Sequence, residues 1–216
     1  MLLNGFFRAL KSFNSLIEKK IRDIYRSSDF YETKISKTFN VVFQYKPSPY
    51  LLSSLINYQN KKYKIDDLDF NNIWESKSQS KEFKKLNNFF WFFSLDLKSS
   101  KKLTQQVISN WIEKNSRYKK DSWEFDITAK RIISWLSNYQ LSYNESNQEY
   151  KFMFDYMIQK QTNHLMNEIK YSKNLEKKII GCSAIILTGL SYKTDRIYLN
   201  FGLNFLKKIT KLSIDN

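Results

Sequence analysis

The chain has 216 residues, which is enough for one domain with a buried core. Hydrophobic residues make up 42% of it and aromatic residues 17%, so a disordered chain is excluded. Only 4 Gly and 2 Pro occur, and so few helix breakers favour long helices over a loop-rich β architecture. The formal net charge of +15 indicates anionic partners, whether acidic polysaccharide, anionic lipid or nucleic acid, attracted by non-specific electrostatics.

The positive charge is dispersed along the sequence. Lysines occur in pairs such as Lys19-Lys20, Lys84-Lys85 and Lys207-Lys208, and no concentrated basic arm is present. We therefore expect no specific nucleic-acid partner. A single cysteine, Cys182, and a single histidine, His164, make a Cys/His zinc site implausible. Because the sequence also lacks a glycine-rich phosphate loop, we expect neither a metal nor a cofactor.

Residues 1–37 are expected to form an N-terminal amphipathic helix. Its apolar side chains recur at helical spacing at Leu3, Phe6, Phe7, Leu10, Phe13, Ile17, Ile21 and Ile24. Basic residues, among them Lys11 and Arg22, fall largely on the other face. We expect this helix to dock on its own domain, with contact to an anionic membrane surface as the alternative. No apolar run is long enough to span a membrane and no signal-peptide cleavage site is evident, so the compartment is left open, with the cytoplasm as the default.

Residues 38–75 are expected to form an irregular linker segment with one or two short strands, or none. The stretch Phe39–Phe43 has the mixed apolar character of a short strand. Pro47 and Pro49 favour extended backbone at the residues before them.

Residues 76–216 are predicted to be a helical domain. The 3.6-residue period places helices at 81–97, 101–115, 126–141, 147–171, 174–190 and 193–212. Asp126, Ser146 or Asn147, and Thr194 or Asp195 are the expected N-caps. The connections are short, so successive helices should pack antiparallel as hairpins. Periodicity alone does not decide whether such hairpins close into an α/α-toroid or form a bundle.

The stretch from Trp123 to Trp135 is the most informative part of the chain. Trp123 precedes a predicted helix, and Arg131 and Trp135 are i,i+4 neighbours on one face of it. A guanidinium held against indole rings can bind a carboxylate bidentately, which makes the segment a candidate anion site. The alternative is that both tryptophans belong to the core and that Arg131 is a surface or capped arginine.

Several segments, in consistent order and spacing, resemble one known family. They are Leu86–Leu97, Asn110–Ile112, Trp123–Trp135 and Ala184–Leu190. Together they are similar to the N-terminal helical domain of heparinase II/III-like polysaccharide lyases, over most of residues 70–212. The resemblance implies a mainly α fold in which antiparallel helical hairpins form an incomplete α/α-toroid, without the family's C-terminal β-sandwich.

The resemblance also implies a substrate class and a reaction. Members of the family cleave acidic uronate polysaccharides, such as glycosaminoglycans or alginate, by β-elimination, and an Asn-His pair serves the substrate carboxylate. Asn163-His164 is such a pair, although Glu176-Lys177 lie where the family's pair normally precedes the helix containing Ala184. We therefore expect Trp123, Arg131, Trp135, Asn163 and His164 to line a groove for acidic polysaccharide, and we leave the catalytic residues unassigned.

Two functional hypotheses follow. In the first, the chain is a fragment or partner-dependent part of a β-eliminating lyase, completed by a β-sandwich domain or a partner chain. An incomplete toroid would then expose an apolar edge near Leu199, Phe201, Leu203 and Leu206. In the second, it is a non-enzymatic basic helical module for anionic polymers or a protein partner. Arg131 and a tryptophan should meet in a concave groove under the first hypothesis, and be buried or scattered under the second.

Overall fold

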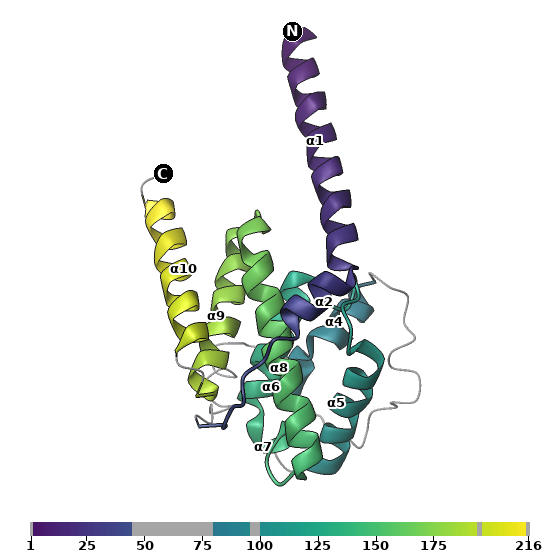
Figure 1. The fold of residues 1–216 in the computed structure, drawn as a ribbon, viewed down its shortest axis with the longest axis vertical. Coiled ribbons are helices and arrows are strands. Elements are labelled where there is room, and N and C mark those ends of the chain that lie inside the picture. The colour runs from purple at the N-terminus through teal and green to yellow at the C-terminus, as the bar shows by residue number, and fades with distance from the viewer. Residues whose placement is uncertain (1, 45–79, 96–99, 194–195, 215–216) are drawn as a thin grey trace.

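The computed structural model describes residues 2–44, 80–95, 100–193 and 196–214, and this part of the chain is mainly helical (Figure 1). The helices are α1 (Leu2–Arg26), α2 (Asp29–Ile35), α4 (Lys81–Asn88), α5 (Lys101–Asn115), α6 (Phe125–Ser137), α7 (Tyr139–Ser142), α8 (Gln148–Glu168), α9 (Leu175–Ser191) and α10 (Ile197–Ile214), with short 3-10 turns η2 (Phe90–Ser94) and η3 (Ile169–Tyr171). The predicted helical class is confirmed, and helix α5 has the predicted bounds.

Two predicted helices are interrupted in the structure. The helix expected over 81–97 ends at Asn88, because Phe89 adopts a left-handed conformation with φ of 58°. Its ring is completely buried, and its backbone carbonyl accepts a hydrogen bond from Ser134 Oγ at 2.5 Å. Tertiary contacts thus hold a bulky residue in a conformation that it rarely adopts. The helix expected over 126–141 likewise breaks at Asn138, between α6 and α7.

Polar side chains begin several of the helices. Asn147 accepts a hydrogen bond from the backbone of Tyr150 at 2.8 Å, which confirms one of the predicted N-caps. The expected cap at Asp126 is wrong, because α6 begins at Phe125 and Asp126 lies in its first turn. The other expected caps, Thr194 and Asp195, lie outside the described residues.

Helix α6 lies at the centre of the domain, in contact with α4, α8 and α9. Nearly its whole circumference is buried, unlike a surface helix that buries a single stripe. The approach of α9 is close, because a Cβ added at Gly181 would lie 2.4 Å from the ring of Phe125. Any polar side chain on α6 must therefore find its partners inside the protein.

Helices α9 and α10 form an antiparallel hairpin at one side of the domain (Figure 1). Two glycines permit their close packing: a Cβ at Gly189 would lie 2.4 Å from the backbone nitrogen of Leu199, and one at Gly202 would lie 2.6 Å from Ile186. The apolar edge expected on α10 is exposed only in part. Leu203 is 39% exposed, whereas Leu199 and Phe201 are half-buried.

The N-terminal region differs from the prediction in two ways. The single helix expected over 1–37 is broken by Ser28, whose hydroxyl caps α2 by accepting from the backbone of Tyr31. Helix α1 also does not dock on the domain along its length, but projects away from it (Figure 1), and its apolar side chains from Phe13 to Ile24 are exposed. The expectation of a docked helix is therefore wrong for the described part of α1.

Only the beginning of the predicted linker segment is described. Residues 38–44 contain no strand, and Phe43 forms an isolated antiparallel bridge with Tyr192. Residues 45–75, with Pro47 and Pro49, lie outside the described part. None of the helices within the described ranges combines the length and the apolar character that a bilayer crossing requires.

Candidate functional site

The side chain of Arg131 is completely buried and ties four elements of the core together. From α6, its Nε donates to Gln161 Oε1 on α8 at 2.8 Å. Its Nη1 donates to the backbone carbonyls of Asn87, at the end of α4, and Ser122, before α6, at 2.7 and 3.0 Å. The guanidinium carbon lies 3.8 Å from the ring centre of Trp111 on α5. These contacts leave the guanidinium no face open to a ligand.

Electrostatics make this arginine unusual. Burial lowers the pKa of Arg131 well below its ordinary value. The oxygens that accept its hydrogen bonds are neutral carbonyl and hydroxyl oxygens, not carboxylates. One of them is the carbonyl of Asn87 at the C-terminus of α4, where the helix dipole favours a cation. Arg131 thus acts as a helix cap placed inside the core.

Both tryptophans of the predicted groove are also buried. Trp123 is 1% exposed, and its indole N–H donates to the carbonyl of Asn115 at 3.1 Å. Trp135 is completely buried, with its ring edge-on to Trp111 at 5.5 Å. The indole partner of Arg131 is therefore Trp111. It is neither Trp135, which the i,i+4 spacing suggested, nor Trp123.

His164 is also buried, one helical turn along α8 from Gln161, the partner of Arg131. Its Nε2 lies 2.9 Å from the carbonyl of Trp123, and because a carbonyl can only accept, Nε2 carries the proton. Nδ1 then accepts from the hydroxyl of Tyr31 on α2 at 2.7 Å. Burial, with a smaller effect of Arg26, lowers the pKa of His164 to about 3, so the ring is neutral at physiological pH.

Asn163, the other half of the Asn-His pair, is half-buried and holds the end of α2. Its Nδ2 donates to the carbonyls of Ile35 and Lys37 at 2.9 and 2.7 Å, and its Oδ1 accepts from Tyr198 Oη at 3.1 Å. At the position that the family resemblance gives to the pair, Glu176 is exposed and Lys177 pairs with Asp126 at 3.0 Å.

The five predicted site residues therefore line no groove among the described residues. Trp123, Arg131, Trp135 and His164 are buried, and their polar contacts are made inside the protein. The concave groove expected from the lyase hypothesis is not found there, and burial is the arrangement that the alternative hypothesis predicted. Arg131 and Trp135 are buried because they lie on α6, which other elements cover on nearly all sides.

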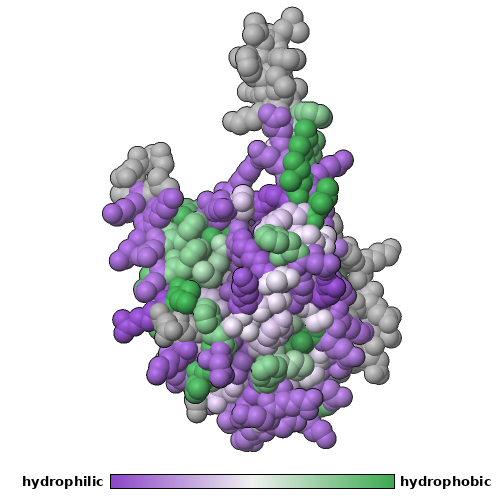
Figure 2. All heavy atoms as spheres, viewed as in Figure 1, coloured by the Kyte–Doolittle hydropathy of each residue, from purple (hydrophilic) through white to green (hydrophobic). Residues whose placement is uncertain are grey.

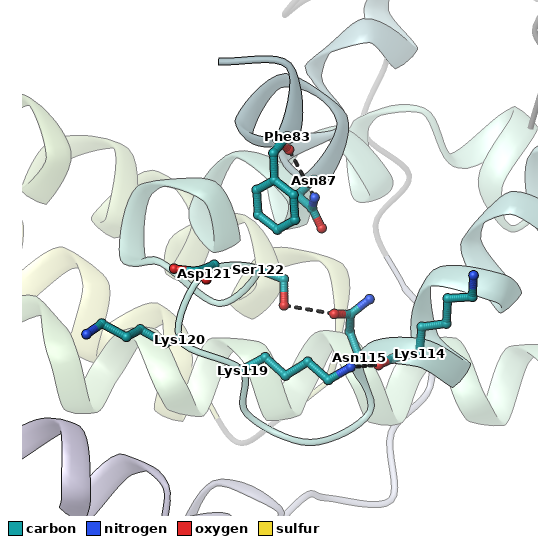
Figure 3. A pocket seen from close by; sticks show the side chains of 8 residues that line it. All are labelled: Phe83, Asn87, Lys114, Asn115, Lys119, Lys120, Asp121 and Ser122. Atoms are coloured by element: carbon teal, nitrogen blue, oxygen red, sulfur yellow. Dashed lines mark hydrogen bonds between the residues drawn. The ribbon is translucent and has the colours of Figure 1, made fainter. Parts of the chain in front are cut away.

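An open pocket of about 270 Å³ lies beside this buried network (Figure 3). It is lined by residues from α4, from the end of α5 and from the loop that leads to α6: Phe83, Asn87, Lys114, Asn115, Lys119, Lys120, Asp121 and Ser122. Two of these, Asn87 and Ser122, provide the carbonyls that accept from Arg131. Arg131 therefore links two walls of the pocket, α4 and the loop before α6, from inside the core.

The polar groups of the pocket floor are satisfied within the protein. Asn87 Nδ2 donates to the carbonyl of Phe83, and its Oδ1 accepts from the indole N–H of Trp111 at 2.8 Å. Asn115 Oδ1 accepts from Ser122 Oγ at 2.8 Å (Figure 3). Asn115 Nδ2 donates to the carbonyl of Trp111. Among the lining side chains, the lysines of the rim are therefore the groups that an anion in this pocket would contact.

The rim of the pocket is basic. Lys114, Lys119 and Lys120 are exposed and outnumber the one acidic lining residue, Asp121. Lys120 pairs with Asp23 at 2.8 Å, and Lys119 donates to the backbone carbonyl of Lys114. Within the described residues, no carboxylate lies within ion-pair distance of Lys114 or Lys119. Such a rim attracts anions, and exposed ammonium groups bind them as point charges with little geometric selectivity.

The described tyrosines whose pKa is shifted are not suited to act as bases. A tyrosine base needs a lowered pKa, yet every described tyrosine with a shifted pKa has it raised, mainly by burial, at Tyr31, Tyr118, Tyr143, Tyr150, Tyr192 and Tyr198. Cys182 is a buried thiol whose pKa is raised to about 11. No cluster of His, Cys, Asp or Glu suited to a metal occurs among the described residues.

Comparisons of the chain with models of protein families, with curated proteins and with solved structures found no match. The site is therefore interpreted from its own geometry.

Sequence reasoning did not identify the pocket lysines. The available signal was the run Tyr118-Lys119-Lys120-Asp121 between two predicted helices, with Lys114 one residue before the end of the first. Lysine pairs are frequent in this chain, so this run is not distinctive in the sequence. Only the packing of the loop beside α4 shows that its lysines line a pocket.

Proposed function

We propose that this chain is a non-catalytic basic helical module that binds an anionic polymer at the pocket lined by Lys114, Lys119 and Lys120. The observation that carries the proposal is the basic rim, in which Lys114 and Lys119 have no carboxylate partner among the described residues. The net charge of +15 supplies long-range attraction for the same class of ligand.

Acidic polysaccharide is the polymer that we propose first. The resemblance to the helical domain of heparinase II/III-like lyases favours it, and in this proposal the helices form an incomplete α/α-toroid. Phe83 is half-buried in the pocket wall and offers an apolar surface beside the charges, as sugar rings require. The burial of Arg131 and the neutral, buried state of His164 support a binding role rather than β-elimination.

The test is a binding measurement with heparan sulfate and alginate oligosaccharides, and with duplex DNA of similar charge. The variant Lys114→Gln/Lys119→Gln/Lys120→Gln removes the basic rim. The matched control Lys207→Gln/Lys208→Gln/Lys211→Gln removes the same charge from exposed positions on α10. We expect the rim variant to weaken binding of the oligosaccharides about tenfold, and the control about twofold, since exposed ion pairs contribute roughly 0.2–1 kcal/mol each.

Equal weakening by the two triple variants would contradict a specific role of the pocket and leave only general attraction by net charge. Tighter binding to DNA than to the oligosaccharides would contradict the proposed polymer class. For the absence of catalysis, the readout is absorbance of the unsaturated uronate product during incubation with heparan sulfate, alginate, hyaluronan and chondroitin. We expect a flat trace, and a rise would contradict a purely binding role.

A further inference from the structure

Helix α1 presents a continuous apolar stripe to solvent. Phe13 is 61% exposed, Leu16 59%, Ile17 41%, Ile21 61% and Ile24 73%. At 3.6 residues per turn these five side chains share one face of the helix. Figure 2 shows the stripe as a green run on the part of α1 that rises from the domain. Such a row of large apolar side chains on a helix marks an interaction surface.

The described part of the domain leaves this stripe uncovered, because the opposite face of α1 is the one attached to it. Arg22 and Arg26 both pair with Glu168 at the end of α8. The guanidinium of Arg22 also lies 3.3 Å from the ring centre of Tyr171, and Lys120 pairs with Asp23. On a helical wheel Arg22 and Arg26 lie opposite Phe13 and Ile24, so these contacts direct the stripe away from the protein.

The charge of α1 selects an anionic partner. Residues 2–26 contain six Lys and Arg against two acidic residues. One of the lysines, Lys20, falls within the apolar stripe on the helical wheel and is exposed. Against a lipid surface, its ammonium group can reach the headgroups while its stem lies along the apolar side chains.

A second copy of the chain fits this surface poorly. Pairing two α1 helices through the stripe would bring Lys20 into an apolar seam, and each copy carries a net charge of +15. A membrane rich in anionic lipid complements both the apolar face and the positive charge. The helix is about 37 Å long, at 1.5 Å per residue, which suits a helix lying in the plane of the surface.

We propose that α1 binds the surface of an anionic lipid membrane, with the stripe from Phe13 to Ile24 inserted at the boundary between headgroups and acyl chains. The ion pairs of Arg22 and Arg26 with Glu168 then connect the domain to the membrane-bound helix. The apolar stripe that carries this inference shares no residue with the pocket, although Lys120 of the pocket rim pairs with Asp23 on α1.

The experiment is co-sedimentation of the full chain with vesicles of phosphatidylcholine, with and without phosphatidylserine. The test variant is Phe13→Gln/Ile17→Gln, since glutamine keeps the helix propensity while removing the apolar surface. The matched control is Phe152→Gln/Leu203→Gln, which changes one exposed Phe on α8 and one exposed aliphatic residue on α10. Circular dichroism checks that the helices remain folded in each protein.

We expect the wild type to bind the phosphatidylserine vesicles, and to do so less at high salt. The α1 variant should lose at least about tenfold in partitioning, because two large apolar side chains no longer leave water. The control should change it by less than about twofold. Equal binding by wild type and α1 variant would overturn the proposal, as would equal binding to both kinds of vesicle. A dimer in sedimentation velocity that the α1 variant converts to a monomer, without vesicle binding by the wild type, would overturn it in favour of self-association.

Discussion

Helices α6 and α1 use similar residues in opposite ways. On α6, the buried Arg131 directs every polar contact into the protein and stacks on Trp111. On α1, Phe13 and Ile24 face solvent, and the basic residues of the opposite face hold the helix to the domain. An arginine and aromatic rings thus stabilise the core at α6, whereas on α1 the arginines attach the helix and the apolar side chains are exposed. Residue type alone does not assign a role, because the role depends on what covers the side chain.

The largest effect on stability is expected from removing the guanidinium of Arg131 on α6. Arg131→Ala leaves the carbonyls of Asn87 and Ser122 and the amide oxygen of Gln161 without their donor, and opens a cavity. We expect the free energy of unfolding to fall by about 3–5 kcal/mol, measured by urea denaturation. The control is Arg117→Ala, because Arg117 is exposed and pairs with the exposed Asp29; it should cost less than about 1 kcal/mol.

A stable Arg131→Ala protein that had lost its affinity for polysaccharide would contradict this account. It would return Arg131 to the role of a ligand-binding residue.

The second effect concerns acid stability through His164. Its folded pKa of about 3 lies below the ordinary value of 6.5, so between these values only the unfolded state binds the proton. Stability from this group therefore falls as the pH drops from 6.5 towards 3, at no more than about 1.4 kcal/mol per pH unit. We expect His164→Gln to reduce this loss, measured as the free energy of unfolding against pH.

The carboxyl group of Asp155 has the opposite effect on stability at low pH. Burial raises its pKa to about 6, against the hydrogen bonds from Tyr192 and Tyr143 that stabilise the carboxylate. Between pH 6 and 3.8 the folded state therefore binds a proton that the unfolded state does not, and acid stabilises it through this group. Asp155→Asn should remove this compensation and make the acid loss steeper. An unchanged pH profile would contradict the assignment.

The third effect separates two buried indoles of the core. The N–H of Trp111 donates to Asn87 Oδ1, and the guanidinium of Arg131 lies over its ring. The N–H of Trp135, in contrast, has no hydrogen-bond partner among the described residues. Both side chains are completely buried. We expect Trp111→Phe to cost about 1–2 kcal/mol more than Trp135→Phe in thermal or urea unfolding. Equal costs would mean that the polar contacts of Trp111 contribute little beyond its volume.

The smallest effect on stability is expected from the exposed stripe of α1. Ile24→Gln on α1 should change the free energy of unfolding by less than about 0.5 kcal/mol, because Ile24 is 73% exposed. Urea denaturation in the absence of lipid is the measurement. A larger loss would show that the stripe is covered by the protein in solution and would weaken the proposed membrane contact.

The sequence identified local structure better than the site. Helix α5 and the cap at Asn147 follow from local periodicity and capping. The break at Phe89 does not, because its left-handed conformation depends on a buried ring and on Ser134 of a distant helix. The same limit applies to Arg131: its i,i+4 neighbour was visible in the sequence, but its true indole partner, Trp111, lies on another helix.

The most direct test is an NMR titration of the 15N-labelled protein with a heparan sulfate oligosaccharide. The account predicts chemical-shift changes at the backbone amides of Lys114 and Lys119–Ser122, with the indole N–H signals of Trp123 and Trp135 and the Arg131 Nε–H signal largely unchanged. Those three groups are buried, whereas the rim lysines are exposed. Large changes at Arg131 and the two indoles, with a silent lysine rim, would contradict the account and restore the groove expected from the sequence.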